Sequence, residues 1–181
     1  MIAEEDGVRL RRASPADVDF LVELGEHPDV DPFLAARRAR DRNGILAEIE
    51  RSLAEPAAFG RVVVEVDGRP AGVMGYERVN ARSRIARLGG LAIHPAFRGG
   101  HVSDVAARLL QRHLILEAGY HRLELEIYGF NERAIRHAER AGFVREGVRR
   151  KAYRRHGSWV DGVLFGLVAE DLSVEAEISK T

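Results

Sequence analysis

The chain contains no cysteine, so it can form no disulfide, no thiolate nucleophile and no cysteine-type zinc site. It also has no net charge, because 28 Lys and Arg residues balance 28 Asp and Glu residues. A polyanion would therefore have to be bound by a local group of residues. No apolar run is long enough to cross a membrane, and the N-terminal MIAEEDGVRLRR lacks the regions of a signal peptide. These absences favour a soluble, cytoplasmic protein.

The first part of the chain predicts a strand followed by two helices. Residues 8–13 form a short strand pattern, and Ser14 with Asp17 forms the capping box that begins a helix. A second helix is predicted over about 44–54. The expected apolar stripe of that helix consists of Leu46, Ile49 and Leu53.

A three-stranded meander is predicted next. Asp67 and Gly68 join two strand-like runs, and this dipeptide is the strongest short signal for a hairpin. Residues 84–93 then form the pattern of a third strand. The meander places three consecutive strands side by side in one sheet.

The last part of the chain alternates between helices and strands. Asn131 is the predicted N-cap of a short helix, and Gly142 is its left-handed stop. The remaining predicted elements are a helix over 101–118 and strands over 122–128, 143–149 and 159–168. Without a repeat or a linker, residues 1–181 are expected to form one α+β domain with its core in 8–168 and an acidic tail over 169–181.

This order of elements resembles the GNAT superfamily of N-acetyltransferases over residues 8–168. The most specific stretches are LGGLAIHPAFRGGHVSDVAARLL and LELEIYGFNERAIRHAERAGF. The stretch REGVRRKAYRRHGSWVDGVLFGL, with Glu146, Gly147, Gly157, Trp159 and Asp161, is similar to the Rim-type branch, which acetylates the N-termini of ribosomal proteins. The resemblance implies a mixed, mostly antiparallel sheet of about seven strands flanked by about four helices. It also implies acetyl-CoA as co-substrate and no metal.

The turn HPAFRGGHVSD has the pattern of a phosphate site, because it ends a strand and exposes backbone amides before a helix. In the family this turn binds the pyrophosphate of coenzyme A. The matching residues here are Arg98, Gly99, Gly100, His101, Val102 and Ser103. His101 replaces a family glycine, which would be costly if the position required a positive φ. Alternatively, its imidazole is a donor to the phosphates.

The resemblance also implies a position for the pantetheine arm of the cofactor. The arm would bond the backbone of Leu91, Ala92 and Ile93 as an added strand. Asn131 would bind the arm while it caps its helix, since the two roles use different side-chain atoms. The preceding Gly89 and Gly90 either admit the thioester or form a bulge, and both interpretations are equally favoured.

Glu126 matches the position at which the Rim-type enzymes that this chain resembles have a general base. Glu124 lies on the same strand face, and the alternative is that both carboxylates simply face solvent. Glu77 is a second candidate through a water chain. No general acid is evident, because the family tyrosine position is Ala138. Tyr128 or Tyr153 could replace that tyrosine, or the thiolate could leave unassisted.

Two classes of function remain open. The leading one is an acetyl-CoA-dependent N-acetyltransferase, monomeric or homodimeric, that acts on a protein N-terminus or a small amine. The other is a non-catalytic GNAT-like module that binds coenzyme A or a partner, because His101, Ala134 and Ala138 depart from the family pattern. Residues 144–156 contain six Lys or Arg residues. A solvent-facing hairpin explains this run slightly better than an acidic substrate does, and nucleic acid is an unlikely partner.

Overall fold

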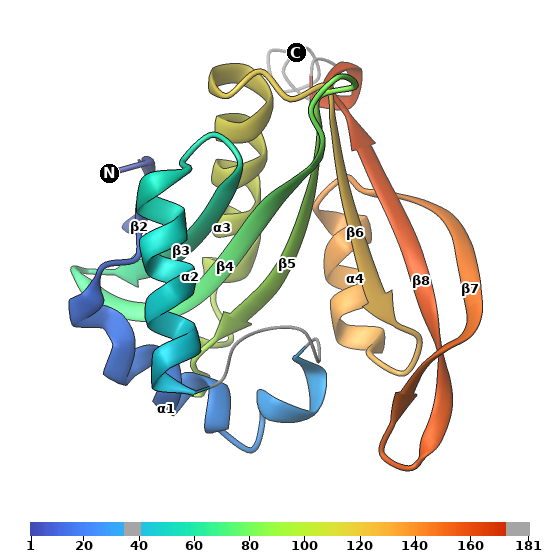
Figure 1. The fold of residues 1–181 in the computed structure, drawn as a ribbon, viewed down its shortest axis with the longest axis horizontal. Coiled ribbons are helices and arrows are strands. Elements are labelled where there is room, and N and C mark those ends of the chain that lie inside the picture. Colours follow the sequence, from blue (N-terminus) through green and yellow to red (C-terminus); the bar gives the residue numbers. More distant parts are fainter. Residues whose placement is uncertain (35–40, 173–181) are drawn as a thin grey trace.

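The fold is built on one eight-stranded sheet with the strand order β1-β2-β3-β4-β5-β6-β8-β7 (Figure 1). The structure is a computed structural model and describes residues 1–34 and 41–172. The strands are β1 (Ala3–Glu5), β2 (Val8–Arg12), β3 (Phe59–Val66), β4 (Arg69–Asn80), β5 (Ile85–Ile93), β6 (Arg122–Tyr128), β7 (Val144–Arg155) and β8 (Ser158–Val168). Neighbouring strands are antiparallel, except that β5 and β6 are parallel. The α+β class is confirmed; β1 is an additional strand that the sequence did not predict.

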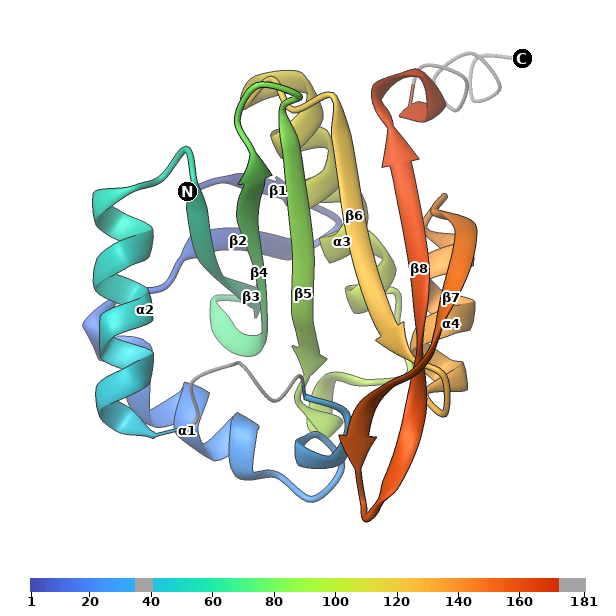
Figure 2. The same ribbon diagram turned by 45° about the vertical axis from the view of Figure 1, so that its right-hand side comes forward.

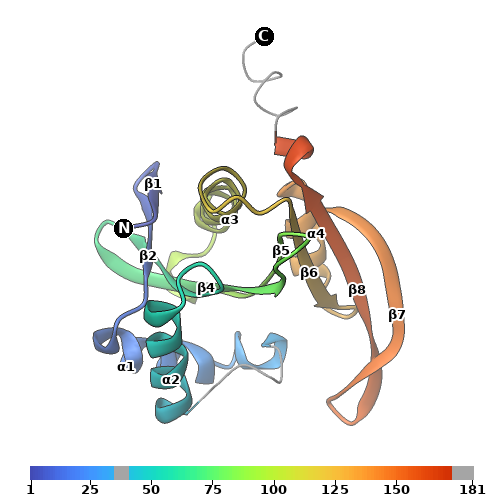
Figure 3. The same ribbon diagram turned by 45° about the horizontal axis from the view of Figure 1, so that its top comes forward.

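Helices cover both faces of the sheet (Figure 3). The α-helices are α1 (Val18–Glu26), α2 (Arg42–Ala54), α3 (Val102–Arg112) and α4 (Glu132–Arg140). Helices α1 and α2 enclose one apolar core against the sheet, which includes Val63 and Val73. Helices α3 and α4 enclose the other, which includes Leu110 and Leu123. Burial on both faces explains the nearly continuous apolar run of β3. Among the described residues, no helix is long and apolar enough to span a membrane.

The local turn signals are confirmed. Asp67 and Gly68 have φ values of 49° and 74°, which is the left-handed conformation that joins the tightly paired β3 and β4. Asn131 Oδ1 accepts a hydrogen bond from the Ala134 amide at 3.1 Å and caps α4. Gly142, which follows α4, has a φ of 84°. These positions depend only on neighbouring residues, so the sequence was sufficient to place them.

The predicted stripe of α2 is partly wrong. Leu53 is 51% exposed, whereas Ile45 and Ile49 are buried against the sheet. Ser52 completes the buried face, because its Oγ accepts a hydrogen bond from the Arg61 amide at 2.9 Å. A polar residue that is buried for its hydrogen bond breaks the apolar pattern from which the stripe was predicted.

Some predicted boundaries also shift. The predicted helix over 101–118 becomes α3 followed by a π-helical segment, His113–Glu117. Strand β7 extends beyond the predicted residue 149 to Arg155. Of the predicted tail, residues 169–172 form a helical turn, and residues 173–181 lie outside the described residues.

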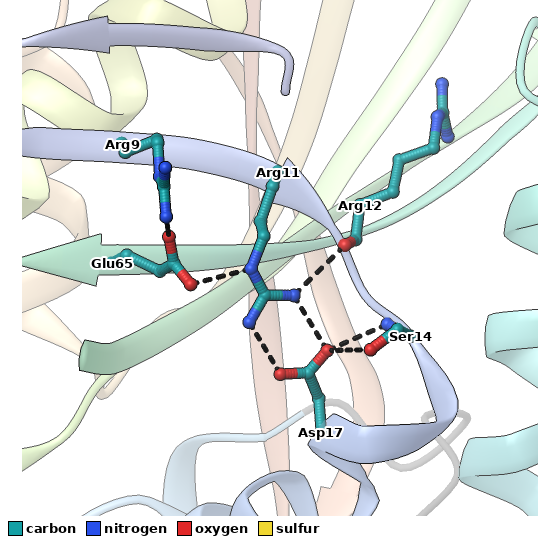
Figure 4. Close-up of polar contacts among 6 residues, drawn as sticks. All are labelled: Arg9, Arg11, Arg12, Ser14, Asp17 and Glu65. Carbon is teal, nitrogen blue, oxygen red and sulfur yellow. Dashed lines mark hydrogen bonds and ion pairs between the residues drawn. The ribbon is translucent and has the colours of Figure 1, made fainter. Parts of the chain in front are cut away.

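A polar network anchors the start of α1 to the sheet (Figure 4). Arg11 on β2 donates two hydrogen bonds of 2.7 Å to Asp17 and one of 2.6 Å to Glu65 on β3. Asp17 also accepts bonds from the amide and hydroxyl of Ser14, as the capping box requires. Arg9 donates a second bond to Glu65 at 2.7 Å. Two nearly buried carboxylates are thereby paired with arginines, which fixes the first helix relative to β2 and β3.

The central feature of the sheet is the separation of β5 from β6. The two strands pair only from Ile85 with Arg122 to Arg87 with Glu124, and then diverge (Figures 1 and 2). In the divergent part, β5 remains paired with β4 and β6 with β8. The sheet therefore stays continuous at one end and opens between its two parallel strands at the other.

Candidate active site

A cavity of about 830 Å³ occupies the opening between β5 and β6. Residues of β5 and β6, and of α3 and α4, line it. On the opposite face of the sheet, α2 and the end of β4 contribute further residues. The cavity therefore passes from the α3 and α4 side of the sheet to the α1 and α2 side. A long ligand can enter from one side and meet a second ligand from the other.

The predicted phosphate turn forms one end of this cavity. Arg98, Gly99, Gly100 and Ser103 line it, and the turn leads directly into α3. Gly99 has a φ of 89°, and no atom lies within 4 Å of the position that a Cβ would take. Backbone amides at the start of a helix are thus accessible without a side chain over them, as anion binding requires.

His101 and Val102 are not among the cavity-lining residues of the described chain. His101 is exposed and has a φ of −79°, so this position does not need glycine. The condition under which His101 would be costly is not met, because the left-handed residue of this turn is Gly99, two positions earlier. Val102 packs against the core beneath α3.

A valine at position 99 is expected to weaken coenzyme A binding by about tenfold or more. The substitution adds a branched side chain over the amides and forces an L-residue into the left-handed region. Isothermal titration with coenzyme A measures the effect. Gly157→Val is a matched control, because Gly157 also has a positive φ of 78° but lies in the β7–β8 turn and is not among the cavity-lining residues of the described chain. Equal affinity in Gly99→Val and the unmodified protein would contradict the phosphate site.

The β5 edge that faces the opening holds the predicted pantetheine positions. Leu91, Ala92 and Ile93 all line the cavity. Gly90, with a φ of 67°, lies in a bulge, since two residues of β5 oppose one residue of β4 there. The Ile93 carbonyl accepts a hydrogen bond from Arg98 Nε at 3.0 Å. The structure thus supports the bulge interpretation of the two glycines, and the bulge lies beside the opening.

Helix α4 forms the opposite wall through small residues. Asn131, Ala134 and Ala138 line the cavity, and the cap uses only the side-chain oxygen of Asn131. The cap does not use the amide nitrogen of Asn131, so this nitrogen is available as a hydrogen-bond donor to a ligand. His137 also lines this wall, and its Nδ1 lies 2.9 Å from Asp104 Oδ1 on α3. Burial lowers the pKa of His137, and the Asp104 carboxylate only partly opposes this effect.

Two arginines give the phosphate end a positive character. Arg98 lies beside Arg133, and burial together with this neighbouring charge lowers the pKa of Arg98. The nearest carboxylate to Arg98 is that of Asp29, at 3.5 Å. Two guanidinium groups near a single exposed carboxylate suit an anionic ligand.

Glu126 lies on the other side of the opening and is 15% exposed. Its carboxylate lines the cavity and receives an ion pair from Arg149 of β7 at 3.2 Å. A Cβ at Gly162 would lie 2.1 Å from Glu126 Oε1, so only glycine at this place on β8 leaves room for the carboxylate. Glu126 is therefore held in a sheltered position beside the cavity, and the alternative of a solvated strand face does not apply to it.

Arg149 and Tyr153 come from a distorted part of β7. Arg149 donates a hydrogen bond to the Tyr153 hydroxyl at 3.2 Å, and Tyr153 lines the cavity. A bulge separates the two residues, with Lys151 at a φ of 50°. Asp161 holds this bulge, because its Oδ1 accepts the Lys151 amide at 2.7 Å. Part of the Rim-like motif thus shapes the strand that carries Arg149.

The other candidate residues differ in their environment. Glu77 lines the cavity but is 45% exposed and pairs with Arg51 at 3.0 Å. Glu124 is not among the lining residues of the described chain, and it pairs with Arg122 at 3.1 Å. Tyr128 lines the cavity and lies 5.3 Å from Tyr153, measured between ring centroids. Of the three acidic candidates, Glu126 is the most sheltered residue at the opening.

Sequence reasoning missed several residues of the site. Arg149 belongs to the basic run that was interpreted as solvent-facing, and no local signal distinguishes it from its neighbours. Arg87 and His137 were also not predicted as site residues, because neither matches a recognised motif position. Gly162 had a weak signal, since a glycine inside a strand often marks a close approach. In the described chain, no group of three or more His, Cys, Asp or Glu residues could hold a metal ion.

A sheet that opens between two parallel strands, with a glycine turn before a helix at one end of the opening and a sheltered carboxylate at the other, agrees with the expected N-acetyltransferase. A family model described as an acetyltransferase (GNAT) domain matches residues 8–144, and the chain belongs to this family. GNAT acetyltransferases use acetyl-CoA. The family assignment agrees with the eight-stranded mixed sheet and its flanking helices.

The individual relatives share less than a third of their residues with this chain. The chain is 28% identical over 172 residues to the SPbeta prophage-derived uncharacterized N-acetyltransferase YokL of Bacillus subtilis (strain 168), covering 93% of this chain and 94% of that protein. A T. thermophilus protein, only provisionally assigned as an acetyltransferase, is 26% identical with a TM-score of 0.76, covering 98% of this chain and 94% of that one.

The fold also matches a crystal structure of spermidine N-acetyltransferase from Vibrio cholerae in complex with CoA and spermine. The TM-score is 0.83 at 17% identity, with coverage of 92% of this chain and 98% of that chain. At this level of identity the match concerns the fold alone. The comparisons establish the superfamily and do not separate a Rim-type branch within it.

Proposed function

We propose that this protein transfers the acetyl group of acetyl-CoA to a primary amine, with Glu126 as the general base. The observation that carries the proposal is the position of Glu126, 15% exposed, at the same cavity as the open β5 edge and the phosphate turn. A proton acceptor, a thioester position and an anion site are thereby combined in one opening. Acetyl transfer to an amine needs the first two together.

The cavity residues fit coenzyme A. Gly99, Gly100 and Ser103 would hold the pyrophosphate with backbone amides, and Arg98 and Arg133 would add positive charge. The β5 backbone over residues 91–93 and the amide nitrogen of Asn131 would hold the pantetheine arm. His101 and Val102 would then contribute through the backbone at the start of α3. When bound, acetyl-CoA supplies the activated acetyl carbonyl.

The chain's own groups carry the proton and charge transfers. As the amine nitrogen bonds to the acetyl carbon and the carbon–sulfur bond breaks, Glu126 accepts the amine proton. Arg149 pairs with the Glu126 carboxylate at 3.2 Å and holds it beside the opening. Backbone N–H groups near the β5 bulge would stabilise negative charge on the carbonyl oxygen. Tyr153, which contacts Arg149 beside Glu126, would protonate the thiolate.

The acceptor amine enters from the α1 and α2 side. Residues of α2 and the end of β4 form this part of the wall, including Ala47, Arg51 and Glu77. The Rim-like motif supports a protein N-terminus as acceptor, and the spermidine acetyltransferases of similar fold support a small amine. Both present a primary amine to the same carboxylate.

Amine-dependent release of coenzyme A thiol tests the proposal. The purified protein is incubated with acetyl-CoA and a panel of amines and N-terminal peptides, and the free thiol and acetylated product are measured together. Release of thiol with stoichiometric product is expected for at least one class of acceptor. Coenzyme A binding without turnover of any acceptor would instead support a non-catalytic binding module.

A further inference from the structure

Arg87 is a cavity-lining arginine that retains unused capacity to bind an anion. It is the last residue of β5 that pairs with β6, and its side chain is 37% exposed. The nearest carboxylate is that of Glu124, at 3.8 Å, which is too long for a hydrogen bond. Within residues 1–34 and 41–172, its guanidinium makes no hydrogen bond at normal distance.

Arg87 and Glu126 face the same side of the sheet. The neighbours of Arg87 in β5, Ala86 and Leu88, pack into the core beneath α3, so the Arg87 side chain points to the α1 and α2 side. Leu125 and Ile127 pack into that same core, so Glu126 also points away from it. Arg87 therefore lies on the side from which the acceptor amine enters.

The cavity carboxylates, by contrast, are already paired. Each of the four that line the cavity has an arginine partner: Glu48 with Arg61 at 3.3 Å, Glu77 with Arg51 at 3.0 Å, Glu126 with Arg149 at 3.2 Å, and Asp29 with Arg98 at 3.5 Å. An ammonium group of a polycation would therefore share each carboxylate with an arginine, which lowers the net attraction. On the acceptor side, Arg87 has the longest ion pair, 3.8 Å to Glu124, and makes no hydrogen bond within the described residues, so its charge is the most available to a ligand.

We propose that the acceptor is an amine that carries a carboxylate a few bonds from its nitrogen, and that Arg87 binds this carboxylate. The inference rests on the proposed acetyl transfer and specifies its substrate class. Arg87 pairs with Glu124, and Glu126 lies two residues further along β6, a separation of about 7 Å along a strand. An acceptor of this size places its amine at Glu126 and its carboxylate at the planar fork of Arg87.

Charge balance favours such an acceptor over a polyamine. A zwitterion adds one positive and one negative group to a site whose own charges are largely paired, and each new group meets an opposite charge. A polyamine adds only positive groups beside Arg51, Arg87 and Arg149. This protein is therefore expected to differ in acceptor from the spermidine acetyltransferases that share its fold.

Matched acceptors that differ only in charge test the proposal in the unmodified protein. Thiol release is measured with β-alanine against β-alaninamide, with Asp-Ala-Ala amide against Asn-Ala-Ala amide, and with spermidine. In at least one pair, kcat/KM for the carboxylate acceptor is expected to exceed that for its amide by about tenfold or more, and to exceed that for spermidine. The first pair identifies a free amino acid, and the second identifies a peptide N-terminus.

Arg87→Gln assigns the preference to Arg87. The variant is expected to raise KM for the carboxylate acceptor by about tenfold and to leave the amide acceptor unchanged, which removes the discrimination. Arg108→Gln is the control, because Arg108 is similarly exposed and pairs with Glu5 on the outer side of α3. Arg87→Lys, which keeps the charge without the fork, should retain part of the preference.

The outcomes separate the two proposals. Turnover with equal rates for each acid and amide, a preference for spermidine, or a discrimination that survives Arg87→Gln would overturn the role of Arg87 but not the acetyltransferase. Failure of every acceptor to release thiol would count against the proposed function. In that case, isothermal titration calorimetry of β-alanine and of Asp-Ala-Ala amide with the coenzyme A-loaded protein tests the carboxylate site by itself. Binding that is lost in Arg87→Gln supports the carboxylate site, and absence of binding overturns it.

Discussion

Glu126→Gln is expected to lower kcat by about a hundredfold or more while coenzyme A binding remains intact. Glutamine keeps the shape of the side chain and the contact with Arg149 through its oxygen, but it cannot accept the amine proton. The carboxylate lies at the cavity on the acceptor side, away from the phosphate turn, so cofactor affinity should not depend on it. Steady-state thiol release and coenzyme A titration measure the two quantities.

Glu124→Gln is the matched control for this prediction. Glu124 lies on the same face of β6, but it pairs with Arg122 and is not among the cavity-lining residues of the described chain. With an amine acceptor that carries no carboxylate, the kcat of Glu124→Gln should stay close to that of the unmodified protein. Gly162→Ala should lower kcat, because its Cβ would lie 2.1 Å from Glu126 Oε1 and displace the carboxylate. Near-normal turnover in Glu126→Gln would transfer the role to Glu77 or to bound water.

Asp17→Ala is expected to lower the free energy of unfolding by about 3 kcal/mol. Asp17 is only 5% exposed and accepts two hydrogen bonds from Arg11 as well as the capping bonds from Ser14. Its removal leaves Arg11 without its main partner and the helix start without its cap. Urea unfolding measures the loss. Asp19→Ala is the control, since Asp19 is 82% exposed and should change stability by about 0.5 kcal/mol or less.

The same network predicts a loss of stability in acid. Burial acts to raise the pKa values of Asp17 and Glu65, but hydrogen bonds from Arg11 and further donors outweigh it, so both pKa values lie below their ordinary values. Groups with a lowered pKa in the folded state stabilise the protein fully above the unfolded-state pKa. Their contribution is lost as the pH falls below about 4. Urea midpoints measured from pH 7 to pH 3 should fall less steeply in Asp17→Ala than in the unmodified protein.

The sequence by itself determined the local elements of this protein. The capping box of Ser14 and Asp17, the turn at Asp67 and Gly68, and the cap at Asn131 each depend on residues a few positions apart. Such interactions form in any context that admits the element, so their residue types alone predicted them. The glycine turn before α3 was predicted for the same reason, and the order of elements then indicated the acetyltransferase family.

Only the tertiary structure decided which charges act together. The pairing of Glu126 with Arg149, the room that Gly162 leaves and the spare capacity of Arg87 depend on strands far apart in the sequence. A bulge shifts which backbone groups and side chains face the opening, and the divergence of β5 from β6 creates the cavity. The bulge and the divergence of the two strands cannot be inferred from local periodicity, because both follow from how the completed sheet twists and packs between its helices.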